Sequence, residues 1–121
     1  MKPLRISDEE LQRSRNNQEI IDATIQQINK DFESAGFDAP LQTGINFLLV
    51  KNKLAEAISY LLNTFHHRFI SMLYRIDIPD HVIMYAIDPA QHEPAEIRLA
   101  DIIIERELLK VLTKRYYKDN L

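Results

Sequence analysis

Apolar side chains recur at helical spacings along this chain. In its first third they alternate in steps of four and three residues: Ile21, Ile25, Ile28, Phe32 and Ala35. This spacing places them on one face of an α-helix. Glycine and proline, the strongest helix breakers, are absent from residues 4–35, 45–78 and 95–121. We therefore predict one long helix in each of these three segments.

The first segment carries signals for both ends of a helix. Ser7 and Glu10 match a capping box, and Gly36 stands where a left-handed C-terminal cap belongs. Between residues 8 and 19 only Leu11 is available to a core. We therefore predict that residues 1–19 form a polar arm that continues into the helix, and that residues 20–121 form a single helical-bundle domain.

The second segment has apolar residues around about half of its helical circumference, which predicts a central helix with neighbours on more than one side. Thr43 is a candidate cap for the N-terminus of this second helix. A straight helix of 34 residues would be about 51 Å long, whereas a compact domain of this size is about 35 Å across. Either this helix breaks near Asn63 and Thr64, or the protein is elongated.

The last part of the chain predicts a short helix at residues 82–87 and a long one that begins at Pro94. Several apolar residues lie off the main apolar face of the long helix: Leu99, Ile102, Ile103 and Leu109. They indicate either deep packing or an oligomer interface. The predicted fold is all-α, an up-and-down bundle of three long helices and one short helix.

Composition narrows the class of protein. The chain has 121 residues, 45% of them hydrophobic and 27% charged, with a net charge of −3 and no cysteine. The proportions of hydrophobic and charged residues are typical of a globular domain. The absence of cysteine excludes disulfides and thiolate metal sites. No apolar run is long enough for a membrane span or a signal peptide. We expect a cytoplasmic protein that does not enter the membrane.

No cofactor or metal site is predicted. The four histidines fit neither the Glu-x-x-His pattern of di-iron bundles nor the His-Glu-x-x-His pattern of zinc hydrolases: His66, His67, His81 and His92. With glycine only at positions 36 and 44, a glycine-rich phosphate loop is excluded. The absence of any catalytic signature favours a protein that is not an enzyme.

One pair of residues keeps an enzymatic alternative open. Arg75 and His81 are separated by five residues, which resembles the arginine–histidine element of HEPN-type helical ribonucleases. The resemblance covers only these two residues, and Pro79 inside the interval departs from the helical setting of that element. It would imply a helical hydrolase or ribonuclease that acts through Arg75 and His81.

Two ionisable residues interrupt predicted apolar faces. Lys51 falls within the face of the second helix, and Asp101 within that of the third. Buried charges are costly unless they are paired, so the two could belong to a polar pocket. Alternatively, Lys51 extends its ammonium group to solvent and Asp101 lies at the edge of its face.

Charge is unevenly distributed in the second half of the chain. Residues 77–105 carry a net charge of −6, and residues 106–118 a net charge of +4. The positive segment combines basic residues with tyrosines: Arg106, Lys110, Lys114, Arg115, Tyr116, Tyr117 and Lys118. Such a mixture can bind nucleic acid, although a basic last turn also complements the helix dipole.

The sequence therefore favours a non-enzymatic interaction module that forms a homodimer or binds a partner helix. Nucleic-acid binding through residues 106–118 is the first alternative, and the hydrolase based on Arg75 and His81 is the second.

Overall fold

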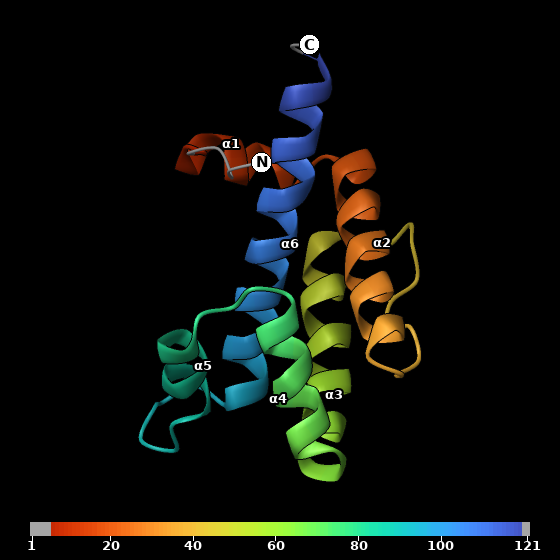
Figure 1. Ribbon diagram of the computed structural model, residues 1–121. Helices are drawn as coiled ribbons and strands as arrows, with labels where there is room; N and C mark the ends of the chain where they lie inside the picture. The colour runs from red at the N-terminus through yellow and green to blue at the C-terminus, as the bar shows by residue number, and fades with distance from the viewer. Residues whose placement is uncertain (1–5, 120–121) are drawn as a thin grey trace.

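The chain folds into α-helices. The computed structural model describes residues 6–119, which contain six helices and no strand. They are α1 (Asp8–Ser14), α2 (Gln18–Ser34), α3 (Phe47–Thr64), α4 (His66–Arg75), α5 (Asp80–Ile87) and α6 (Ala95–Asp119). The helices gather around α6 (Figure 1). The predicted all-α bundle is confirmed, and α5 is the short helix predicted at residues 82–87.

The first predicted helix is divided in two. Ser7 Oγ accepts a hydrogen bond from the Glu10 amide at 3.2 Å, as the capping box predicts, but α1 ends at Ser14. Asn17 then caps α2 by accepting from the amide of Ile20 at 3.3 Å. An asparagine side chain competes for backbone hydrogen bonds in this way and favours caps over helix interiors. The single continuous helix was therefore a wrong prediction.

The predicted polar arm corresponds in part to α1. Within α1, Ser14 is buried and Leu11 is half-buried. The guanidinium of Arg15, just after α1, lies 5.2 Å from the ring centre of Phe47 at the start of α3. Residues 1–5 of the arm lie outside the described residues.

Gly36 ends α2 as predicted. It adopts a φ of 86°, and its amide donates to Glu33 O while the amide of Phe37 donates to Phe32 O, both at 2.9 Å. This pair of bonds is a Schellman motif, whose left-handed residue is usually glycine. The Phe32 and Phe37 rings pack at 6.5 Å, the apolar contact that often accompanies the motif.

The second predicted helix breaks, which is one of the two alternatives that its length allowed. The break is at Phe65, between α3 and α4, where φ is −132° and ψ is 52°. The Phe65 ring packs 6.2 Å from Phe37 and 6.4 Å from Tyr60. At the other end of α3 the cap is Asn46, which accepts from the Leu49 amide at 2.9 Å, so the predicted cap Thr43 is wrong.

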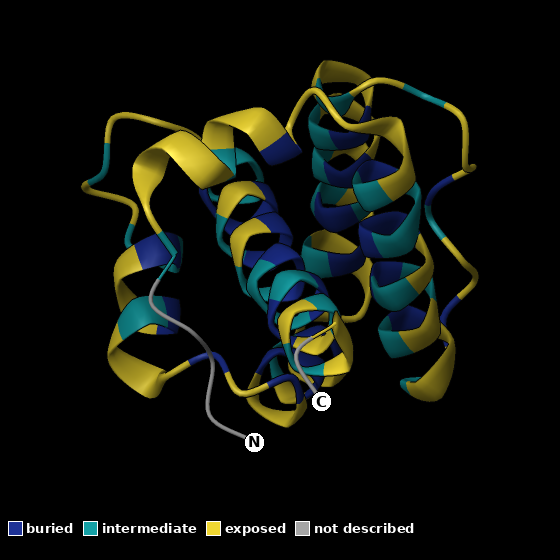
Figure 2. Ribbon diagram, turned by 90° about the horizontal axis from the view of Figure 1, so that it is seen from above, coloured by how far each residue is buried: buried dark blue, intermediate teal, exposed yellow. Residues whose placement is uncertain are grey.

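The central helix is α6, which packs along both α2 and α3. The sequence predicted residues 45–78 for this position, but the break at Phe65 divides that segment, whereas α6 continues over 25 residues. Leu99 and Ile103 are fully buried, so deep packing accounts for part of the apolar surplus of α6, and Ile102 and Leu109 are half-buried. Figure 2 shows buried residues on the sides of the helices that face one another.

The C-terminal end of α6 extends past the other helices (Figure 1). Tyr116 there is 48% exposed. Within residues 6–119, none of the helices is both long enough and apolar enough to cross a bilayer.

Candidate functional site

An open groove lies between α3 and the N-terminal half of α6. The buried residues of α3 lie on one face, which includes Leu54 and Ile58, and leave Leu48, Ala55 and Ser59 on another. Ile97 of α6 contributes apolar surface opposite them. This part of the groove encloses about 800 Å³, and a second part of about 370 Å³ continues beyond Lys51 toward α1. We call the whole depression the α3–α6 groove.

The charges that line the larger part of the groove are mainly negative. Glu56 of α3, Glu96 of α6 and Glu93, just before α6, all line it, together with the single cation Lys51. Leu48 at its edge is 65% exposed, the highest value among the exposed large hydrophobic residues. An apolar surface bordered by one sign of charge is typical of a binding site for a complementary protein segment.

The two ionisable residues that interrupt apolar faces are paired with each other. Lys51 Nζ lies 3.1 Å from Asp101 Oδ1, and their side chains are 31% and 48% exposed. Solvent still reaches both, so neither is an isolated buried charge. A pair this exposed contributes at most about 1 kcal/mol. It joins α3 to α6 between the two parts of the groove.

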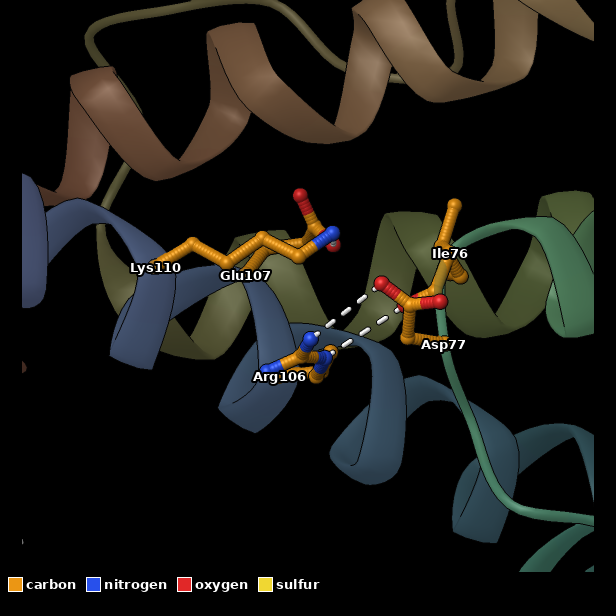
Figure 3. A network of polar contacts seen from close by, with 5 residues as sticks. All are labelled: Ile76, Asp77, Arg106, Glu107 and Lys110. Carbon is orange, nitrogen blue, oxygen red and sulfur yellow. Dashed lines mark hydrogen bonds and ion pairs between the residues drawn. The ribbon is translucent and has the colours of Figure 1, made fainter. Parts of the chain in front are cut away.

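The basic segment at residues 106–118 is partly paired with acidic residues. Arg106 contacts Asp77 Oδ2 at 3.5 Å (Figure 3), and Arg115 contacts Glu19 Oε1 at 3.0 Å. Lys110 Nζ donates to Glu107 Oε1 at 3.0 Å. The remaining basic residues of this segment, Lys114 and Lys118, are exposed on the projecting end of α6, beside Tyr116 and Tyr117, whose rings pack edge to face at 5.5 Å.

Arg75 and His81 lie on different helices. The Arg75 guanidinium, at the end of α4, donates to Ser34 O of α2 at 3.4 Å. His81 is exposed in the first turn of α5, and the neighbouring Asp80 accepts a hydrogen bond from the Tyr74 hydroxyl. The other three histidines are also exposed, and the described part of the chain brings no three potential metal ligands together.

Sequence reasoning missed a buried acidic pair between α2 and α6. Glu107 is fully buried, and buried oxygens of both Glu107 and Asp31 lack a hydrogen-bond donor. Burial first, and then a hydrogen bond with Asp31, raise the pKa of Glu107 to about 7. A signal was present: Glu107 lies three residues after Ile104 and four before Val111, which places it on the same face of the helix as these two apolar residues.

Arg98 is a second buried charge that the sequence did not reveal. It is 7% exposed and donates to Ala86 O at 3.0 and 2.6 Å and to Asp88 O at 3.2 Å, as well as to Glu93 O. These carbonyls lie at and beyond the end of α5, where the helix dipole is negative. Arg98 therefore fixes α5 to the start of α6.

Comparisons of this chain with protein-family models, with curated proteins and with solved structures find no match.

Proposed function

We propose that this protein is a non-enzymatic interaction module that forms a homodimer through the α3–α6 groove. The occupant of the groove is the projecting end of the basic segment, residues 114–118 of α6, from a second copy. The observation that supports this proposal is that one chain carries two surfaces of opposite charge, an acidic groove and a basic helix end that projects from the bundle (Figure 1).

The helix end has the features that the groove requires. Lys114 and Lys118 are four residues apart and exposed, so they lie on one face of α6 and can approach the groove carboxylates together. Tyr116 and Tyr117 supply aromatic surface for Leu48. An amphipathic helix in an apolar groove is a common mode of protein recognition, and charges at its edge select the partner.

A twofold axis makes the contact reciprocal. When two copies place their α6 helices antiparallel, the basic end of each meets the groove of the other. Both contacts then form together, and the assembly closes at two copies instead of growing into a filament.

Charge reversal tests the proposal. Sedimentation equilibrium of the wild type should give twice the mass of one chain, with weaker association at high salt because exposed ion pairs are screened. A groove variant (Glu93→Lys, Glu96→Lys) and a tail variant (Lys114→Glu, Lys118→Glu) should each be monomeric. Mixed together they should form a heterodimer, because each groove then meets a tail of opposite charge.

The control matched to the groove variant is Glu33→Lys with Asp38→Lys. It makes the same change in charge as the groove variant, at exposed positions away from the groove, and should leave the dimer intact. A wild type that stays monomeric at every concentration would contradict the proposal. A monomer that binds RNA or DNA in a salt-dependent way, and loses that binding in the tail variant, would support the nucleic-acid alternative instead.

A further inference from the structure

The interface between α2 and α6 contains an acidic side chain at a position where packing favours an apolar one. Glu107 is 0% exposed, and its neighbours on the buried side of α6 include Ile103, Ile104 and Val111. An ionised carboxylate without a full set of partners is costly in such surroundings. The protein therefore needs a means of neutralising this group.

Asp31 of α2 provides the partner. Carboxylates only accept hydrogen bonds, so two ionised groups cannot bond to each other. The buried atoms Asp31 Oδ2 and Glu107 Oε2 have no hydrogen-bond partner. A proton on Glu107 turns one acceptor into a donor and joins α6 to α2. Lys110, whose Nζ is 3.0 Å from Glu107 Oε1 (Figure 3), instead favours the ionised form.

We propose that Asp31 and Glu107 form a proton-dependent latch between α2 and α6. With a proton on Glu107, the latch holds the helices together. When that proton leaves, two negative charges face each other in the interface, and α2 is released more readily from α6. This device is independent of the dimer proposed above.

The electrostatics of the site place the transition close to neutral pH. Burial, the hydrogen bond with Asp31 and the charge of Asp31 raise the pKa of Glu107 from 4.5 to about 7, against the opposing effect of Lys110. The folded protein thus binds a proton that the unfolded chain releases between pH 4.5 and 7. Stability from this group is complete below pH 4.5 and is lost as the pH rises to about 7.

The other helices bring no group that shifts the pKa of Glu107, although Arg75 of α4 donates to Ser34 O of α2. Asp31 and Lys110 are the two groups that act on Glu107. The buried residues of α3, α4 and α5 are all apolar within the described residues. Arg106, next to Glu107, is directed to Asp77 and Ile76 O (Figure 3). A change of pH between 5 and 8 therefore reaches this interface through Glu107.

Two measurements on the full chain test the latch. In a ¹³C NMR titration of side-chain carboxyl groups, the Glu107 signal should change with a midpoint near 7. Hydrogen exchange, corrected for the intrinsic dependence on pH, should show that amides of α2 lose protection roughly 10- to 100-fold between pH 5 and pH 8, because most of the interval between a pKa of 4.5 and one of about 7 falls within this range.

The decisive variant is Glu107→Gln, whose neutral amide can donate to Asp31 at every pH. Its α2 protection should be constant between pH 5 and pH 8. Glu105→Gln is the matched control, because Glu105 is exposed on the same helix, and it should behave as the wild type.

Two results would overturn the latch. One is a Glu107 carboxyl that titrates at its ordinary value in the wild type, a readout that does not depend on whether any variant folds. The other is an equal loss of protection in α2 and α3 between pH 5 and pH 8, because that pattern would mean a global loss of stability without a specific release of α2.

Discussion

Two of the pairs of ionisable residues that link α6 to its neighbours differ in their exposure to water and in the charges that they combine. Lys51 and Asp101, of opposite charge, join it to α3 at the surface, 3.1 Å apart and 31% and 48% exposed. Asp31 and Glu107, both acids, join it to α2 at a site where Glu107 is 0% exposed. One helix thus carries an ordinary ion pair on one side and an acid pair on the other.

The difference shows how burial decides the chemical form of a contact. Water screens the exposed pair, so its two opposite charges gain little from each other. Inside the protein, the cost of removing water from the Glu107 carboxylate exceeds the stabilisation that Lys110 provides. A proton therefore neutralises Glu107, whereas in the surface pair each charge is neutralised by the opposite charge of its partner. The α3 side of α6 should therefore be indifferent to pH between 5 and 8, and the α2 side sensitive to it.

Arg98 of α6 extends the comparison to a buried cation. Arg98 cannot lose its proton in a protein, so it must be satisfied by acceptors instead. Replacement by Met keeps much of the packing volume but leaves the carbonyls of Ala86 and Asp88 without their donor. We expect Arg98→Met to lower the free energy of unfolding by about 3 kcal/mol, measured by urea denaturation.

The control for this variant is Arg13→Met, an exposed arginine of α1, which should change stability by less than about 0.5 kcal/mol. An equally small effect of Arg98→Met would show that water replaces the arginine at the end of α5. Buried and exposed charges of α6 would then contribute to stability in the same way.

Lys110 offers a way to sharpen the contrast within the buried site. At pH 8 Glu107 is mostly ionised, and Lys110 is the cation that stabilises it; at pH 5 Glu107 is protonated and needs no cation. Lys110→Met should therefore lower the free energy of unfolding by roughly 1–2 kcal/mol at pH 8 and by much less at pH 5. Urea denaturation at the two pH values measures both effects.

Lys114→Met removes an exposed lysine one turn further along α6, and its effect should be small and equal at pH 5 and pH 8. An effect of Lys110→Met that is equally independent of pH would contradict the assignment of Glu107 as the titrating group.

Local signals predicted the elements of this fold better than their breaks. Ser7 and Gly36 mark helix ends by chemistry that the sequence displays directly. The break at Phe65 has no such mark. The Phe65 ring there packs 6.2 Å from that of Phe37, a contact between residues far apart in the sequence. Neither this break nor the one before α2, which Asn17 caps, contains glycine or proline, and periodicity alone does not reveal them.

The same limit applies to the charged pairs. The apolar pattern identified Lys51 and Asp101 as exceptions, but it could not show that they meet, because that requires knowing which faces of two helices are opposed. Glu107 was counted with the basic segment of α6, although its spacing from Ile104 and Val111 places it on the buried face. Asp31 carries no signal on its own, since only the packing of α2 on α6 brings it to Glu107.

The smallest expected effect belongs to the surface pair, and it completes the comparison. A double-mutant cycle of Lys51→Met and Asp101→Asn should give a coupling energy below about 1 kcal/mol, the same at pH 5 and pH 8 and smaller at high salt. Solvent contact at both side chains is the reason. A coupling above about 2 kcal/mol, or one that changes between these pH values, would mean that water does not screen this pair. Charges on both sides of α6 would then interact without screening by water, and the difference in burial could not explain why α2 alone responds to pH.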